Sequence, residues 1–498
     1  MSSTWNPSAA QGPGYGDTED DGVPLPLAVP RWPEDAPPGP DFAAVRAEFD
    51  VPEDFPPDVL AEAERAAAAP DLPEFDATEL PLVTVDPAGS QDLDQAVHLQ
   101  RWHGGYLVSY AIADVGAVVR PGSALDAEAR RRGQTLYSPD RRVPLHPTVL
   151  SEGAASLLPD QVRAAALWTI RLDADGEVRA VDLRRARVRS RAQLAYADVQ
   201  ARADAGTLPD PIALLPQLGT LLERAAAARG AIELGTPEQQ VVRTEGGGWT
   251  LVARSDLPVE GWNAQVSLLT GRAAARLMLD GGVGLLRTLP PARPEDVARL
   301  RRLAPALGVD WPAGAAPGQV LAGLDVADAR HAAFLEEAAA LLRGAAYTPL
   351  DGTEPAHTGH AGVGAPYAHV TAPLRRLADR FATEVCLALA AGTEPDPAVR
   401  AALPELPALM AASDRRIRAV ERAVVDATEA WLLAGREGAE FDAVVVDADG
   451  DRGTVVLQEP AIRARCTGTG LTAGSRVRVR LEEADVARRS VRFAAVAA

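Results

Sequence analysis

The sequence predicts an α+β fold in which a mixed sheet packed with helices precedes a small C-terminal antiparallel β-barrel. Three observations predict it. Short strand patterns fill residues 80–188, and helical patterns dominate from about 196 to 435. Residues 436–498 return to short strands divided by turn residues, as in an OB-like barrel. The length of 498 residues exceeds one ordinary hydrophobic core, so more than one domain is expected.

The chain divides into five expected segments. Residues 1–40 form an acidic arm, rich in Pro, Gly, Asp and Glu, which we expect to be disordered. Residues 41–75 form a helical segment. The main domain is expected over residues 76–395, and a helical connection over 396–435 leads to the barrel at 436–498.

The predicted elements of the main domain begin with strands. A buried strand is expected over 80–85, and two strands over 96–102 and 105–115 flank a His-Gly-Gly turn. A helix over 123–133 has a serine cap, acidic residues early, arginines late and a glycine at its end. A second hairpin spans 166–188 around Asp-Ala-Asp-Gly.

The composition excludes several kinds of chemistry. Lysine is absent, and all 50 basic residues are arginine. A P-loop and a Schiff base both need lysine, so no nucleotide cofactor is expected. Cys386 and Cys466 make no CxxC pair, which argues for a reducing cytoplasm and against structural zinc. Since the chain has neither a signal pattern nor a long apolar run, we expect a cytoplasmic protein without a membrane span.

The acidity of the chain is concentrated at its N-terminus. The formal net charge is −19, but the first 80 residues carry 18 acidic residues against 3 arginines, and the rest carries 51 against 47. The body of the chain is therefore close to neutral. It can hold local basic channels for a nucleic acid, whereas the acidic arm cannot attract phosphates.

Three aspartates gather in the stretch Thr84–Val97, TVDPAGSQDLDQAV. A strand delivers Asp86 to a short loop, and the chain returns with Asp92 and Asp94, whose side chains point the same way if the segment is extended. Facing carboxylates raise one another's pKa unless a cation lies among them, and Mg²⁺ prefers such oxygen ligands. The stretch predicts a magnesium site, and the alternative interpretation is a solvated acidic loop.

A second cluster spans residues 360–380, HAGVGAPYAHVTAPLRRLADR. An ordered loop is expected up to Pro373, and Arg375 and Arg376 follow at the start of a helix. The exposed amides of a helix N-terminus and two guanidiniums together form a phosphate site. The alternative interpretation is that both arginines pair with surface acids.

Together the two stretches resemble the RNB catalytic domain of the bacterial ribonuclease II / ribonuclease R family. The resemblance covers about residues 75–395, with the family motifs in the correct order. The matching motifs are Asp86 with Asp92 to Gln95, Ile112 to Val115 (Ile-Ala-Asp-Val), Tyr137 to Arg141 (Tyr-Ser-Pro-Asp-Arg) and Tyr367 to Leu377. The set is specific as a whole, although neither of the two stretches would be specific alone.

The resemblance implies a 3′→5′ exoribonuclease that hydrolyses single-stranded RNA to nucleoside 5′-monophosphates with Mg²⁺, or Mn²⁺ in its place. A metal-activated water is then the nucleophile, so no lysine or histidine base is required. The implied catalytic residues are Asp92, Asp94 and Arg375. The implied metal ligands are Asp86, Asp92, Asp94 and Gln95. The implied RNA contacts in the main domain are Tyr137, His369, Thr371 and Arg376.

Gln95 departs from the family pattern, because the family has its last aspartate at this position. An amide oxygen can bind Mg²⁺ but brings no charge, so one metal site should weaken. The leading expectation is an active exoribonuclease. The alternative is a catalytically weak or inactive RNA-binding or regulatory protein of the same fold. A third class, a DNA-directed phosphohydrolase, would cut DNA and RNA alike.

The expected RNA-binding apparatus is short. Family members usually carry OB-folds ahead of the catalytic domain, whereas only a short acidic segment precedes it here, and that segment cannot funnel RNA. In the barrel, Arg476, Arg478 and Arg480 alternate along one strand and predict a stripe that follows the RNA backbone. The alternative is a solvated strand face. Single-stranded RNA is the expected partner, and a monomer is expected.

Overall fold

The computed structural model describes residues 39–496, apart from Glu245 and Ala327. The acidic arm predicted over residues 1–40 therefore lies outside the described residues, except for its last two positions. No helix in the described ranges is long and apolar enough to cross a membrane.

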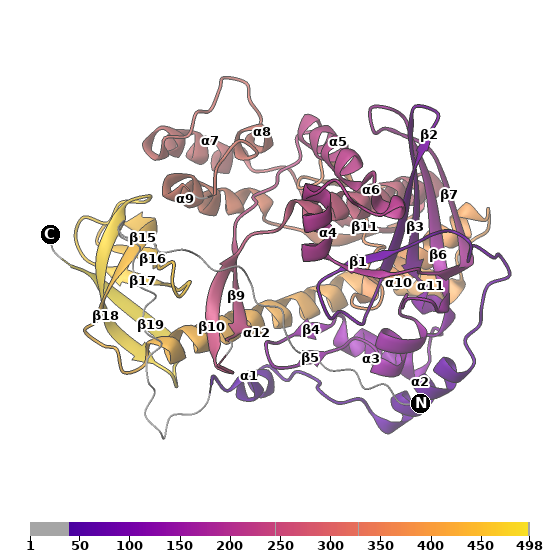
Figure 1. Ribbon diagram of the computed structural model, residues 1–498, viewed down its shortest axis with the longest axis horizontal. Helices are drawn as coiled ribbons and strands as arrows, with labels where there is room; N and C mark the ends of the chain where they lie inside the picture. The colour runs from indigo at the N-terminus through magenta and orange to yellow at the C-terminus, as the bar shows by residue number, and fades with distance from the viewer. Residues whose placement is uncertain (1–38, 245, 327, 497–498) are drawn as a thin grey trace, which may run out of the picture. The chain divides into compact units, whose positions relative to one another are not determined.

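An antiparallel sheet of four strands forms the centre of the main domain (Figure 1). The strands lie in the order β2–β3–β6–β7 and have the bounds Gln95–Trp102, Gly105–Ala113, Val162–Leu172 and Val178–Arg189. The predicted turn joins β2 to β3, and its residues His103 and Gly104 have positive φ angles of 43° and 85°. Such angles suit the tight turns of twisted hairpins, and the turn sets Gln95 opposite Ile112.

A parallel pair of strands makes the arrangement mixed, as predicted. Val83 forms an antiparallel bridge with Val97 of β2. The chain then continues into β1 (Thr84–Asp86), which runs parallel to β8 (Gln193–Ala195). The strand expected over 80–85 is shorter than predicted, because Pro81 has no N–H to donate to a ladder.

Both faces of the sheet are buried, each by different helices. On one face, large side chains such as Tyr110 and Trp168 pack against α4, α5, α6 and α10. On the other face, small side chains such as Ala111 and Ala165 pack against α2 and α3. Successive residues of a strand point to opposite faces, so the alternation of large and small residues assigns each helix group to its face. The helix bounds are α2 Pro57–Ala68, α3 Ala124–Arg132, α4 Tyr196–Asp204, α5 Leu215–Ala228, α6 Pro258–Gly281 and α10 Leu377–Ala390.

The N-terminal segment braces a short hairpin beside the sheet. Helix α1 (Phe42–Glu48) packs on the long helix α12 (Leu406–Leu433). Its Arg46 is almost wholly buried and donates to the Ser138 hydroxyl at 2.9 Å and to the Asp140 carboxylate at 2.6 Å. Both partners lie in the turn between β4 and β5, whose bounds are Leu136–Tyr137 and Arg142–Val143.

The stretch from 196 to 435 contains three two-stranded sheets that its helical pattern did not reveal. Each strand has six residues or fewer, and a helical pattern is read over a longer window, so the strands escaped detection. The strand bounds are β9 Glu238–Arg243, β10 Trp249–Arg254, β11 Val283–Thr288, β12 Ala346–Asp351, β13 Gly359–His360 and β14 Ala365–Pro366. The remaining helices are α7 Pro294–Leu303, α8 Pro317–Leu321, α9 Ala329–Ala338 and α11 Pro397–Ala402.

The C-terminal strands form a closed barrel at the end of α12 (Figure 1). Their order is β15–β16–β17–β19–β18, and the pair β17–β19 is parallel while the others are antiparallel. A closed ring with an odd number of strands cannot alternate direction throughout, so one parallel pair is required. The α+β fold class with an OB-like barrel is thus confirmed. The strand bounds are β15 Glu440–Asp449, β16 Arg452–Val456, β17 Arg463–Thr467, β18 Arg476–Asp485 and β19 Ser490–Ala495.

Gly271→Ala should destabilise the main domain. Gly271 lies on α6 where its carbonyl oxygen accepts from the Ala368 amide at 3.1 Å. An added Cβ would overlap the Tyr367 ring and lie 2.5 Å from the Ala368 carbonyl oxygen. Overpacking of this kind costs about 1–3 kcal/mol, which urea unfolding would measure.

Gly261→Ala on the same helix is the matched control. Its added Cβ would meet only the end of the Glu223 side chain, at 3.3 Å. The control should be neutral, or more stable by up to about 1 kcal/mol, because alanine favours the helix. Equal unfolding free energies for the two variants would contradict the close packing of α6 on the Tyr367 loop.

Candidate active site

The loop that carries the predicted aspartates is anchored at both ends. β1 ends at Asp86, and Gly89, with a φ of 81°, turns the loop back toward the sheet. Ser156 holds the returning segment, since its hydroxyl donates to the Gln91 carbonyl oxygen at 2.6 Å and accepts from the Leu93 amide at 2.9 Å. The Leu93 side chain is buried in the core on the alanine-rich face of the sheet. Its two acidic neighbours therefore face the other way, into a cleft.

The loop before α10 is fixed by a buried carboxylate. Asp379 is fully buried, accepts from the Ala372 amide at 2.8 Å and forms an ion pair with the Arg376 guanidinium. This pairing turns the Arg376 side chain inward. Arg375 instead lines the cleft, with half of its side chain exposed. The helix start predicted at these two arginines is present, but it directs one guanidinium to the cleft and the other to the interior.

Asp94 joins the two stretches, which lie 280 residues apart in the chain. Its carboxylate accepts from the Leu374 amide at 2.8 Å and from Nε of Arg375 at 3.3 Å. Gln95 adds a second link, because its side-chain amide donates to the Thr371 carbonyl oxygen. The cleft above these contacts has a volume of about 670 Å³. Aspartates and a guanidinium from remote segments thus border one cavity.

Tyr137 forms another wall of the cleft. Its hydroxyl donates to Asp92 at 3.1 Å, and its side chain is half exposed, so it is not a core residue. Asp92 also accepts from Nη1 of Arg142 at 2.5 Å. The exposed ring of Tyr137 offers a flat surface at the mouth of the cleft, while its hydroxyl stays tied to the acidic loop.

Two of the aspartates hold protons more tightly than usual. Burial raises the pKa of Asp86 to about 6, and the charge of Asp92 adds to the rise. Burial also raises the pKa of Asp94 to about 8, although Arg375 and the Leu374 amide oppose the rise. One oxygen of Asp86, Oδ2, is buried without a hydrogen-bond partner among the described residues. Asp86 therefore lacks a donor at one oxygen, and neither carboxylate has enough positive charge beside it to offset its burial.

The donor set fits a hard divalent cation. The cleft offers carboxylate oxygens of three aspartates and the amide oxygen of Gln95, whose NH₂ group is already used on Thr371. Within the described ranges no three acidic, histidine or cysteine side chains lie close enough to enclose an ion by themselves. Mg²⁺ is commonly held by one or two carboxylates, with water and a substrate phosphate completing its shell. The oxygen ligands of the cleft therefore fit Mg²⁺ even though the side chains alone do not enclose an ion.

The other predicted site residues of the main domain do not line the cleft. His369 contacts the Tyr347 hydroxyl through Nδ1 at 2.7 Å. Thr371 is buried and uses its carbonyl oxygen on Gln95. Arg376 is paired with Asp379. The contacts of these three residues therefore lie within or beside the loop that carries Arg375 and not in the cleft.

The arginine stripe on the barrel is faced by acids of the neighbouring strand. In the β15–β18 ladder, Arg478 lies opposite Asp442, and the two form an ion pair at 2.9 Å. Arg480 pairs in the same way with Glu440 at 2.9 Å. Arg476 lies opposite Val444 and is exposed. The barrel phenylalanines, Phe441 and Phe493, are buried against each other in its core and offer no stacking surface.

The sequence did not single out several residues of the site. Arg142 lies one position beyond the quoted tyrosine motif, and its arginine type next to that motif was the available signal. Tyr196 lines the cleft from the start of α4 and accepts from Asn263 at 3.3 Å, and no motif marks it. Asp379 lies in the quoted stretch 360–380 but was not assigned a role.

A groove of about 930 Å³ leads from Tyr137 toward the barrel. It runs between the β9–β10 hairpin, α12 and strands β16 and β17. Its lining includes Arg418, Arg422, Arg463 and Arg465 together with Glu238, Glu421, Asp426 and Glu429. Tyr137 lines both this groove and the catalytic cleft, so the two cavities meet at its ring.

The fold and the site define a class of protein: an α+β domain with an acidic cleft bordered by arginine, followed by an OB-like barrel. Residues 75–388 match the RNB domain, and residues 439–496 match the RNase II-type exonuclease C-terminal S1 domain. The chain therefore belongs to the RNB family, as the sequence motifs predicted.

Curated ribonuclease R and exosome exonuclease proteins match between 32% and 80% of this chain. Ribonuclease R of Aquifex aeolicus is 27% identical over 420 residues, which are 80% of this chain and 58% of the relative. The chain spans no more than 58% of the length of the curated relatives that it matches.

Two solved structures share the fold. The apo form of Mycoplasma genitalium RNase R has a TM-score of 0.81 at 19% identity and covers 92% of this chain and 78% of its own. Yeast Ssd1, described as a pseudonuclease, has a TM-score of 0.66 at 16% identity and covers 83% of this chain and 54% of its own.

His146→Gln should reduce the acid sensitivity of the folded protein. Burial lowers the pKa of His146 to about 3, and its ring donates to the Pro373 carbonyl oxygen in the Arg375 loop. Between about pH 6.5 and 3 the unfolded chain binds a proton that the folded chain does not, so stability falls as the pH falls. One such proton accounts for up to about 1.4 kcal/mol per pH unit.

Urea unfolding at several pH values measures this slope. His146→Gln should flatten it in the acid range. The matched control, His103→Gln, removes an exposed histidine from the β2–β3 turn, and its slope is compared with that of His146→Gln. An unaltered slope for His146→Gln would show that this histidine does not titrate on unfolding.

Proposed function

We propose that this protein is a Mg²⁺-dependent exoribonuclease that degrades single-stranded RNA from its 3′ end and releases nucleoside 5′-monophosphates. The observation that carries the proposal is the contact between Asp94 and Arg375 at 3.3 Å on the floor of the cleft. A metal-binding carboxylate and a phosphate-binding guanidinium are thereby held within the reach of one phosphodiester.

Each proposed role follows from a placement in the cleft. The metal would be held by one or two of the carboxylates of Asp86, Asp92 and Asp94, together with the amide oxygen of Gln95, water and a substrate phosphate. When bound, Mg²⁺ lowers the pKa of a water that attacks the phosphate and neutralises charge on the phosphate oxygens. Arg375, fixed by Asp94 at Nε, keeps its other N–H groups for a phosphate oxygen. The half-exposed ring of Tyr137 would stack on a base at the mouth.

The path of the RNA is proposed to follow the groove from the barrel to Tyr137. The M. genitalium relative has been solved with single-stranded and with double-stranded RNA bound, which supports RNA as the ligand class. On the barrel, Arg476 is the exposed member of the stripe, whereas Arg478 must leave Asp442 to contact a phosphate. Exposed ion pairs of this kind are worth at most about 1 kcal/mol, so a phosphate can displace the carboxylate.

A second candidate function is RNA binding without cleavage. Two observations favour it: Gln95 stands where the family has an aspartate, and a protein described as a pseudonuclease shares the fold. The two candidates differ in whether the three remaining aspartates bind the metal tightly enough for hydrolysis.

Asp94→Asn should lower the rate of RNA shortening at least about 100-fold, because it removes a negative charge from the metal-binding edge. The measurement follows a 5′-labelled single-stranded RNA with Mg²⁺ on a sequencing gel. Asp182→Asn, which alters an exposed carboxylate paired with Arg184, is the matched control and should cut as the unchanged protein does. Circular dichroism verifies that both variants are folded.

The same assay separates the alternatives. Uncut RNA with measurable binding by the unchanged protein would reject the exoribonuclease and support the second candidate. Equal cutting of DNA and RNA oligomers would indicate a phosphohydrolase that ignores the 2′-hydroxyl.

Gln95→Asp should lower the Mg²⁺ concentration needed for half-maximal cleavage by about tenfold, because it adds a charge at the metal edge. Gln91→Asp is the matched control, since it adds the same charge at an exposed position of the same loop. A Mg²⁺ titration of both variants makes the comparison. Similar shifts for the two variants would mean that position 95 is not a metal ligand.

A further inference from the structure

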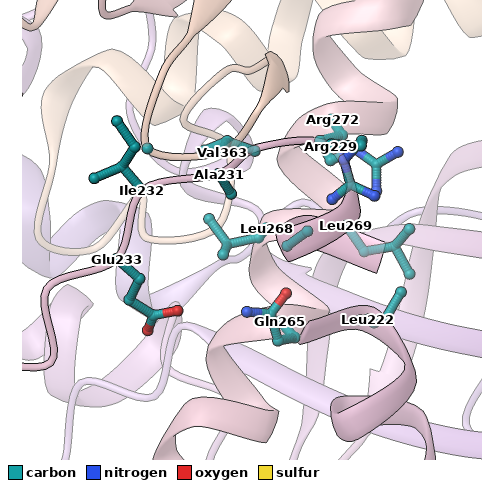
Figure 2. A pocket seen from close by; sticks show the side chains of 12 residues that line it. Leu222, Arg229, Ala231, Ile232, Glu233, Gln265, Leu268, Leu269, Arg272 and Val363 are labelled. Carbon is teal, nitrogen blue, oxygen red and sulfur yellow. The ribbon is translucent and has the colours of Figure 1, made fainter. Parts of the chain in front are cut away.

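A second enclosed cavity lies away from the catalytic cleft (Figure 2). It has a volume of about 170 Å³ and lies between α5, α6 and the loops at residues 229–233 and 362–363. It shares no lining residue with the catalytic cleft. Gly362 and Val363 lie in the quoted stretch 360–380, but neither was assigned a role, and the proposed exoribonuclease reaction does not use the residues of this cavity.

Two arginines stand side by side at one end of this cavity (Figure 2). Arg229 caps the C-terminus of α5, and Arg272 projects from α6. Neither guanidinium forms an ion pair or a hydrogen bond with any residue in the described ranges, and Nε and Nη1 of Arg229 are buried. Most buried donors in proteins have partners, so the two buried nitrogens of Arg229 need an explanation.

The electrostatics of the pair are unfavourable without a ligand. Burial lowers the pKa of Arg229, and the positive charge of Arg272 lowers it further. Burial also lowers the pKa of Arg272. Glu177 attracts both charges but forms no ion pair with either. Two like charges that have lost part of their hydration are stabilised when an anion lies between them.

The other residues that line the cavity restrict the part of the ligand that carries the anionic group. Leu222, Leu269 and Val363 supply apolar surface. Gln265 and Glu233 lie toward the other end of the cavity, away from the arginine pair (Figure 2). The carboxylate of Glu233 would repel a second anionic group at that end. A ligand would therefore be small, with its negative charge at one end and an uncharged polar or apolar body.

We propose that this cavity binds a small phosphate-bearing ligand, with the phosphate between the guanidiniums of Arg229 and Arg272. Two planar guanidiniums offer more N–H donors than the two oxygens of a carboxylate can use, whereas a phosphate presents three oxygens in different directions. Inorganic phosphate and phosphate monoesters such as a sugar phosphate or a mononucleotide share this chemistry.

The test is isothermal titration calorimetry of the full chain with inorganic phosphate, ribose 5-phosphate and adenosine 5′-monophosphate as separate probes. Arg229→Gln and Arg272→Gln should each weaken binding at least about tenfold, the loss expected when a charge-assisted hydrogen bond is removed. Arg224→Gln on α5 and Arg276→Gln on α6 are matched controls. Both controls remove an exposed arginine from the same helices and should bind as the unchanged protein does.

Separate controls test whether the variants are folded and whether the catalytic cleft contributes to phosphate binding. Each variant removes one of two like charges, so its melting temperature without phosphate should be equal to or higher than that of the unchanged protein. Phosphate should raise the melting temperature of the unchanged protein but not that of Arg229→Gln. Arg375→Gln removes the proposed phosphate-binding guanidinium of the catalytic cleft, so the phosphate binding that remains in this variant is the binding expected between Arg229 and Arg272.

The outcomes of the titrations show whether the ligand is inorganic phosphate or a phosphate monoester, and one set of outcomes would reject the proposed site. Tighter binding of a phosphate monoester than of inorganic phosphate would identify the uncharged body as part of the ligand, and equal binding would identify the phosphate alone. The proposal is overturned if no probe binds, or if binding is lost in Arg375→Gln and kept in both arginine variants of the cavity. Asp94→Asn should bind phosphate normally, so failure of the proposed exoribonuclease would leave this result untouched.

Discussion

The buried carboxylate of Asp94 is the interaction on which the site depends. A carboxylate removed from water is costly unless donors surround it, and here the Leu374 amide and the Arg375 guanidinium supply them. Both donors come from a loop 280 residues further along the chain. If that loop moved away, the buried carboxyl group of Asp94 would lose both of its donors. The same interaction therefore holds the loop in place, keeps Arg375 at the cleft and sets the electrostatics of the acidic edge.

In a chain without lysine, the role of each arginine is decided by the nearest carboxylate. Arg376 has the buried Asp379 as a partner and is structural, although it neighbours Arg375, which keeps part of its guanidinium for the cleft. Arg46 has Asp140 and braces the turn beside Tyr137 in the same way. Arg229 and Arg272 lack such a partner among the described residues, which is the basis of the proposed anion site in their cavity.

Features that depend on residues close together in the sequence could be predicted, whereas features that depend on residues far apart in the sequence could not. The hairpin β2–β3 and the capped helix α3 depend on neighbours within a few positions, so they lie where the patterns predicted them. Arg375 and Arg376 have different roles because Asp94 pairs with the first and Asp379 with the second, on different sides of the start of α10. No local sequence pattern shows which carboxylate lies beside which arginine. The barrel stripe depends on the β15–β18 register, which brings Asp442 opposite Arg478. The family motifs located the cleft because they record such long-range pairings indirectly.

Gln95 affects the net charge of the cleft as well as the set of metal ligands. The side chains that line the cleft in the described structure include three aspartates and two arginines, Arg142 and Arg375, so their ionised forms leave one net negative charge. One divalent cation and one phosphodiester would bring that total to zero. An aspartate at position 95 would leave an excess negative charge and favour a further cation. If the proposed reaction takes place here, glutamine at this position balances the charge of the cleft for a single metal ion, and that ion would lower the pKa values that burial raises at Asp86 and Asp94.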